Sequence, residues 1–267
     1  MERPASLRRK AIKYLNHLIL ACQFLTIIPI RKKIDIEDGD LARSMAFFPI
    51  VGLLLGIILV VSNKILSGYI PHTLTDILLL VLLVFLTGGL HLDGLADTMD
   101  ALAGSWDKEE ALRIMKEGRI GAIGAVSLIL LLIVKYLSLS ALNPEIKNQA
   151  LLVMPIIGRW VMVPAAYLGS YARREGGIGK GFIELVGMRE LIIATTITIL
   201  LVLFFFRIRG MYILIGTIFV SMLIFRYLSR RFGGMTGDTL GAIGELTEVF
   251  FLIFAVVAYP AGMERYT

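Results

Sequence analysis

Apolar residues run along this chain in long blocks and do not alternate with polar ones. Seven blocks approach the roughly 20 consecutive apolar residues that a helix needs to cross a bilayer. The pattern predicts an all-α, polytopic membrane protein with a single domain, 1–267, in which a transmembrane bundle at 47–261 is followed by a C-terminal tail at 262–267. The expected spans are Phe47–Ser62, Leu74–Leu92, Ile120–Leu142, Gln149–Tyr171, Leu191–Phe206, Met211–Tyr227 and Thr247–Ala261.

The segment 1–46 is expected to lie at the cytoplasmic surface. Within it Leu15–Ile30 is apolar, but three polar residues interrupt this stretch and Pro29 ends it. We therefore predict an interfacial or re-entrant helix here and no further span.

Lys and Arg are distributed unevenly over the connections between spans. Twenty lie on the side that holds the N-terminus and residues 93–119, against five on the other side. Because cytoplasmic loops carry an excess of Lys and Arg, we expect the first side to face the cytoplasm. The net charge of +6 follows from this bias and does not indicate a nucleic-acid partner.

The amino-acid composition also indicates a membrane protein. Hydrophobic residues make up 57% of the chain and the mean hydropathy is +0.80, outside the range of a soluble domain. Cys22 is the single cysteine, which excludes a disulfide framework and a cysteine-rich metal site. The oligomeric state is left open, because the small residues Gly52 and Gly56 permit close helix contacts, including those of a homodimer.

Three aspartates interrupt the apolar pattern in Leu86–Leu102, LTGGLHLDGLADTMDAL. Asp93, Asp97 and Asp100 are spaced i, i+4 and i+7, which places them within an arc of about 60° on a helix. Three carboxylates on one face repel one another and resist desolvation, and a divalent cation removes both problems. We therefore predict a hard-metal site, with Gly94 letting an anion approach the backbone. A solvated acidic helix start is the alternative.

A second acidic group follows in the stretch GGMTGDTLGAIGELTEVF. Asp238 and Glu245 are seven residues apart and fall on nearly the same helical face, and Glu248 lies close to one turn further on. Glu248 is expected to enter the bilayer, where an unpaired carboxylate is costly. If both groups face one cavity, they would form a site for two divalent cations, or for one cation and a general base.

Five cations are candidates for contacts with these carboxylates or with an anionic ligand. Arg119 stands among glycines where the third span begins, GRIGAIGA, a setting suited to phosphate. Arg173 and Lys180 lie in a glycine-rich loop that is typical of a lid over an anion, although an ordinary flexible loop is the alternative. Arg159, between two prolines in PIIGRWVMVP, suggests a broken helix open to a cavity. Lys135 lies in an apolar span and is expected to pair with a carboxylate.

The motifs GGLHLDGLADTMDAL, KEGRIGAIG and GGMTGDTLGAIGELTE, in this order among the spans, resemble the cobalamin synthase family, the adenosylcobinamide-GDP ribazoletransferases. The resemblance covers nearly the whole chain. It implies a Mg²⁺-dependent enzyme of the cytoplasmic (inner) membrane in which α-ribazole, or its 5′-phosphate, displaces GMP from adenosylcobinamide-GDP and completes the nucleotide loop of cobalamin.

The resemblance and the spacing of the residues together identify candidate residues of the active site. The base would be Asp100 or a member of the second acidic group. The catalytic candidates are Asp93, Asp97, Asp100, Asp238 and Glu245, the metal ligands are these five with Glu248, and the substrate-binding candidates are Gly94, Arg119, Arg159, Arg173 and Lys180.

Two other functions are compatible with parts of the pattern. DGLAD is distantly similar to the motif of the CDP-alcohol phosphotransferases, but Asp97-Thr98 stands where that family has Ala-Arg. An ion-coupled transporter would use Lys135, Arg159 and Glu248 as charges at the membrane midplane. The acids cluster at one membrane face and no inverted repeat is evident, which disfavours transport.

Overall fold

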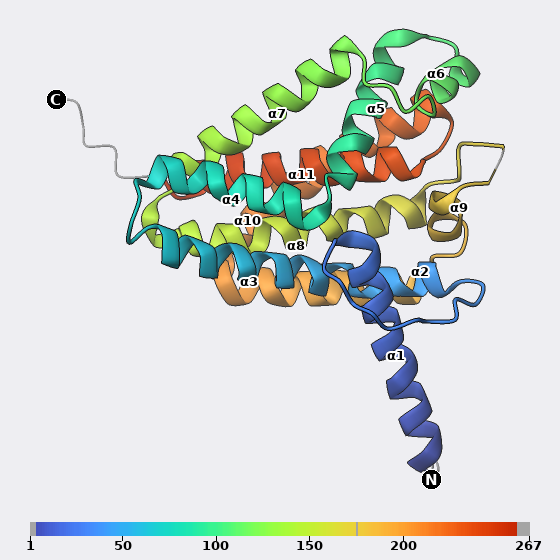
Figure 1. Ribbon diagram of the computed structural model, residues 1–267, viewed down its shortest axis with the longest axis horizontal. Helices are drawn as coiled ribbons and strands as arrows, with labels where there is room; N and C mark the ends of the chain where they lie inside the picture. The colour runs from blue at the N-terminus through green and yellow to red at the C-terminus, as the bar shows by residue number, and fades with distance from the viewer. Residues whose placement is uncertain (1–3, 175, 261–267) are drawn as a thin grey trace.

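The described part of the chain, residues 4–174 and 176–260 of a computed structural model, is built from helices (Figure 1). No strand occurs within these residues, so the all-α prediction is confirmed. The predicted tail at 262–267 lies outside them. The elements are α1 (Pro4–Leu25), α2 (Asp40–Ser44), the 3₁₀ turn η1 (Met45–Phe47), α3 (Phe48–Leu66), α4 (His72–Thr87), α5 (Leu90–Gly104), α6 (Lys108–Ile114), α7 (Ala122–Ser140), α8 (Pro144–Leu168), α9 (Ile178–Ile183), α10 (Met188–Phe232) and α11 (Gly237–Ala258).

The long helices alternate in direction along the bundle. As a result, the beginnings of α3, α7 and α11 gather at the same end as the last turns of α4 and α8 (Figure 1). The shorter helices α5, α6 and α9 lie at this end too, which we call the site end. The short helices and the longer connections between helices are thus concentrated at one end of the apolar bundle.

Helix α8 packs against α3, α10 and α11 and forms the centre of the bundle. Two glycines let α3 approach it closely. A Cβ atom at Gly52 would lie 2.5 Å from the carbonyl oxygen of Pro155, and one at Gly56 would overlap the backbone of Leu152. These small residues therefore pack within the chain and no longer argue for a homodimer.

Five helices in the described residues are long and apolar enough to cross a membrane, or six if α4 and α5 count as one broken span. The chain is therefore a multi-pass membrane protein.

Helix α10 is counted as one of these five helices, although it contains a break at Arg207, where φ is 52°. Phe206, before the break, lies beside Tyr259 at the end of α11, whereas Arg231 contacts Ser105 at the site end. The predicted spans 191–206 and 211–227 are thus two arms of α10, and the total of seven stays a prediction.

The predicted continuous span Leu74–Leu92 is wrong, because the chain turns by 90° between α4 and α5. Gly88 and Gly89 form the turn with φ values of 61° and 69°, in the left-handed region that favours glycine. The turn directs α5 across the site end. All three aspartates of the first motif then lie on α5, as the spacing predicts.

The predicted break in the helix around Arg159 is also wrong. Helix α8 continues from Pro144 to Leu168 with Pro155 and Pro164 inside it. A proline removes one backbone hydrogen bond and usually bends a helix. Every residue from 155 to 163 is buried, so contacts with the neighbouring helices hold this stretch in helical form.

Helix α1 projects away from the bundle, across the direction of the long helices (Figure 1). It does not meet the length and apolarity of a membrane span. Ala21 and Leu25 are fully buried, whereas Tyr14 and Leu15 are exposed. These features fit the predicted interfacial helix, which begins earlier than expected and ends before Thr26.

The contact between α3 and α8 predicts the effect of one added methyl group. Gly56→Ala places a Cβ against the Leu152 backbone and should lower the free energy of unfolding by about 1–3 kcal/mol. Thermal denaturation in detergent measures this change. Gly68→Ala is the matched control, because its Cβ would have its nearest neighbour at 3.7 Å. Equal melting temperatures for the two variants would contradict this packing.

Candidate active site

The two acidic motifs meet where α5 crosses α11. A Cβ atom at Gly94 would lie 2.8 Å from the carbonyl oxygen of Asp238, and one at Gly241 would lie 3.1 Å from Cα of His91. A side chain at either glycine would push the helices apart. The space beside Gly94 is therefore taken by the backbone of Asp238, whereas the sequence suggested an anion there.

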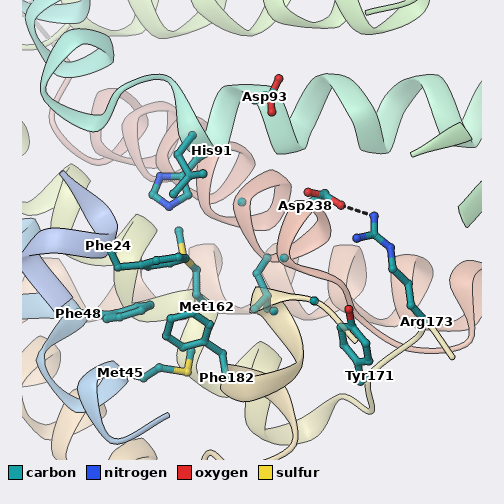
Figure 2. Close-up of a pocket in the computed structure, with 16 residues that line it drawn as sticks. Phe24, Met45, Phe48, His91, Asp93, Met162, Tyr171, Arg173, Phe182 and Asp238 are labelled. Atoms are coloured by element: carbon teal, nitrogen blue, oxygen red, sulfur yellow. Dashed lines mark hydrogen bonds and ion pairs between the residues drawn. The ribbon is translucent and has the colours of Figure 1, made fainter. Parts of the chain in front are cut away.

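A cavity of about 240 Å³ lies at this crossing (Figure 2). Asp93 and Asp238 both line it, as expected if the two motifs share one cavity. Arg173 lies beside them and donates a hydrogen bond of 2.6 Å to Asp238. One side of the cavity therefore presents two carboxylates and a guanidinium group.

The loop between α8 and α9 forms a wall of the cavity. Tyr171, Arg173 and Gly177 of this loop line the space together with Gly179 in the first turn of α9, in agreement with the predicted lid position. Two backbone hydrogen bonds hold the start of this loop against the residues before α11, with Met235 as partner in both. The loop is thus fixed at one end, close to Asp238.

Asp97 lies one helical turn after Asp93 on α5, but it is not among the residues that line the cavity, although the sequence suggested that it shares the cavity with Asp93. Its carboxylate is repelled by the charges of Asp93, Asp238 and Asp100 and attracted by that of Arg173. This crowding of hard oxygen donors fits a divalent cation. Among the described residues, no three acidic, His or Cys side chains form a complete metal cage. Mg²⁺ does not require one, because it usually keeps waters and binds one or two carboxylates together with substrate phosphates.

Asp100 points to a different partner from the other two aspartates of α5. Its carboxylate accepts hydrogen bonds from the backbone N–H groups of Gly121, at 2.6 Å, and Gly124, at 2.8 Å. It therefore caps the start of α7, where free N–H groups favour an anion. A Cβ at either glycine would overlap this carboxylate. The glycines around Arg119, which the sequence predicted to hold a phosphate, therefore make room for the carboxylate of Asp100.

Glu245 and Glu248 do not line the cavity, although the sequence suggested that they face it. Lys135 of α7 donates to Glu245 at 2.5 Å and to Glu248 at 2.6 Å, and Arg159 of α8 pairs with Glu248. All four side chains are buried. The predicted pairing of Lys135 is confirmed, and the two glutamates have cationic partners inside the bundle.

The remaining cationic candidates lie apart from the cavity. Arg119 is exposed in the turn before α7. Lys180 is exposed on α9, 3.8 Å from Glu184. Arg159 is 1% exposed and belongs to the buried network. Among the cations named from the sequence, Arg173 is the one that the structure places in the cavity wall.

The sequence interpretation overlooked His91 and the apolar side of the cavity. His91 is 4% exposed, and neither ring nitrogen has a hydrogen-bond partner among the described residues. A histidine two positions before Asp93 in an apolar run was a usable signal. The apolar lining comes from distant segments of the chain. No sequence signal pointed to it, because each of its residues has the pattern of an ordinary core residue. Its aromatic and thioether members are Phe24, Met45, Phe48, Met162 and Phe182.

Comparison with known proteins agrees with the motifs in this cavity. The model of the cobalamin-5-phosphate synthase family matches residues 17–256. The adenosylcobinamide-GDP ribazoletransferase of Clostridium acetobutylicum is 36% identical over 92% of this chain and 98% of its own length. Enzymes of the same name from Acetivibrio thermocellus and Syntrophobacter fumaroxidans are 38% and 39% identical, over 91% of this chain and 98% and 99% of their lengths. No solved structure matches the chain. The chain belongs to the cobalamin-5-phosphate synthase family.

Proposed function

We propose that this protein is an adenosylcobinamide-GDP ribazoletransferase, which joins α-ribazole or its 5′-phosphate to adenosylcobinamide-GDP and releases GMP. Its relatives bear this name, and they align with nearly the whole chain. The structural observation that supports the proposal is the cavity in which Asp93 and Asp238, from the two acidic motifs, meet beside Arg173. Phosphoryl transfer depends on such groups to position phosphates and balance their charge.

The chemistry assigns a task to each group on the polar side. A ribose hydroxyl that is free in both α-ribazole and its 5′-phosphate attacks the phosphorus atom on the cobinamide side of the pyrophosphate. The bond from this phosphorus to the bridging oxygen breaks, and GMP leaves with the electron pair. Arg173 would bind the phosphate oxygens and thereby release Asp238 from its ion pair. Asp238 would then accept the proton of the attacking hydroxyl.

Asp93 and Asp97 are the residues that we propose as Mg²⁺ ligands. Among the described residues, the Asp93 carboxylate has no hydrogen-bond or ion-pair partner, and Asp97 is crowded by like charges. A bound Mg²⁺ would offset the negative charge of the pyrophosphate and of departing GMP. Asp100 is better explained as a cap of α7, since both of its oxygens accept backbone hydrogen bonds.

We further propose that the cavity faces the cytoplasm from the inner membrane. It lies at the site end, with Arg173 in its wall and Arg230 and Arg231 at the nearby end of α10. Cations concentrate on the cytoplasmic side of membrane proteins. This orientation also accounts for the net charge without a nucleic-acid partner.

Ion-coupled transport is less consistent with the structure. A coupling site needs charges that a moving ion can reach, usually at a broken helix. Here Lys135 and Arg159 are compensated by Glu245 and Glu248, all four are buried, and α8 is continuous through Arg159. We interpret this network as a structural element of the bundle.

Activity of the purified protein tests the proposed function directly. With Mg²⁺, adenosylcobinamide-GDP and α-ribazole, the wild-type protein should produce cobalamin and GMP, and absence of both products would refute the assignment. Asp97→Asn should lower the rate by at least about a hundredfold with unchanged thermal stability, because charge stabilisation in the site is lost. Asp35→Asn, in the exposed loop before α2, is the matched control. Release of CMP from a CDP-linked lipid would favour the phospholipid alternative.

Metal dependence has its own test. Removal of divalent cations with EDTA should abolish product formation, and added Mg²⁺ should restore it. Asp93→Asn should raise the Mg²⁺ concentration needed for half-maximal rate, whereas Asp107→Asn, at the cap of α6, should leave it unchanged. Full activity in EDTA would contradict a catalytic role for Mg²⁺.

The buried network predicts a loss of stability with a defined rescue. Lys135→Met leaves two glutamates with one cation and should lower the free energy of unfolding by about 3–5 kcal/mol. The double variant Lys135→Met/Glu245→Gln restores the charge balance and should recover much of this loss. Denaturation in detergent measures both, with Lys64→Met, exposed near the end of α3, as control. If Lys135→Met is as stable as this control, the network is not a structural element.

A further inference from the structure

The cavity has two chemically different sides (Figure 2). Asp93, Asp238 and Arg173 form the polar side described above. On the other side, the rings of Phe24 and Phe182 lie 4.6 Å apart between centroids, and the ring of Phe48 lies 5.9 Å from that of Phe182. The three rings therefore form one aromatic surface within the cavity wall.

His91 lies between the two sides. In Figure 2 its ring is beside Phe24 and Met162, below Asp93 in the view. It is almost fully buried, and both ring nitrogens lack partners among the described residues. A buried polar group without a hydrogen bond is unfavourable, because it has lost its contacts with water. Neither nitrogen is accessible in this structure, so a ligand in the cavity would satisfy one of them once the ring turns it toward the cavity.

The volume limits what can occupy the space. About 240 Å³ is below the roughly 300–1,000 Å³ of pockets that enclose a drug-sized ligand. A corrinoid macrocycle, with four linked five-membered rings and their amide side chains, is far larger than such a pocket. A bicyclic aromatic base with part of its ribose is of suitable size and shape.

We propose that this cavity is the binding site of the acceptor nucleoside, with the aromatic base against Phe24, Phe48 and Phe182 and the hydroxyls of the ribose toward Asp93 and Asp238. The inference rests on the proposed function and assigns its two substrates to different places. The acceptor enters the cavity, and the corrinoid donor stays outside it and presents its pyrophosphate to the polar side.

The histidine supplies specificity within this site. A benzimidazole attached to ribose through one ring nitrogen keeps a second ring nitrogen as a hydrogen-bond acceptor. Neutral imidazole carries one N–H donor. His91 donates this hydrogen to the free nitrogen of the base, while the aromatic surface contacts the ring edges and methyl groups.

Steady-state kinetics with each substrate varied in turn tests the placement. Phe182→Leu should raise the KM for α-ribazole about three- to tenfold through lost aromatic contact, with the KM for adenosylcobinamide-GDP unchanged. Phe204→Leu makes the same change at a side chain of α10 that is 77% exposed, and it should alter neither value. A rise confined to the KM for adenosylcobinamide-GDP, or no rise, would overturn the placement.

An analogue series tests the role of His91 separately. His91→Leu should raise the KM for α-ribazole about tenfold, as loss of a buried hydrogen bond does. The corresponding indole nucleoside has C–H in place of the free ring nitrogen, so the wild-type protein and the variant should have equal KM values for it. An equal effect of His91→Leu on both nucleosides would overturn the hydrogen bond.

Photolabelling of the unmodified protein covers the case of a variant that fails to fold. An azido-substituted α-ribazole should label peptides that contain Phe24, Met162 or Phe182, and unlabelled α-ribazole should prevent this. Labelling confined to other segments in a wild-type protein that makes cobalamin overturns the placement and leaves the proposed function intact. A wild-type protein that makes no cobalamin refutes the proposed function, and the placement with it.

Discussion

The close crossing of α5 and α11 is the constraint on which the cavity depends. Gly94 and Gly241 allow the two backbones to touch, and this contact brings Asp93 and Asp238 into one space although about 145 residues separate them. The sharp turn at Gly88–Gly89 is the second requirement, because a straight continuation of α4 would carry Asp93 away from α11. Helix packing thus creates the polar side before any ligand is bound.

The acidic residues of α11 show that sharing a helical face does not mean sharing an environment. Asp238 and Glu245 are two turns apart, about 10 Å along the axis. This distance takes the chain from the cavity, where Asp238 meets Arg173, into the bundle, where Glu245 meets Lys135. A charge in the bundle needs a permanent partner, whereas one beside the cavity can exchange its partner for a ligand.

Much of the architecture could be predicted from sequence because it follows from local patterns. Apolar blocks located the long helices, the i, i+4 spacing placed Asp93 and Asp97 together, and the cost of a buried charge predicted a carboxylate partner for Lys135. The rest depends on tertiary contacts that the same patterns do not encode. The partner of Asp100 lies 21 residues away along the chain, at Gly121, and the apolar side of the cavity is assembled from five separate elements.

The glycines of this chain show how a motif can be correct and its usual interpretation incomplete. The string around Arg119 has the composition of a phosphate site, yet Gly121 and Gly124 are small because the carboxylate of Asp100 occupies the space beside them. Gly158 likewise makes room for Glu248. In a membrane bundle, small residues are required wherever helices approach closely. Their clustering near acidic residues therefore indicates first where helices cross, and the crossing then determines which carboxylates face a cavity and which are buried in the bundle.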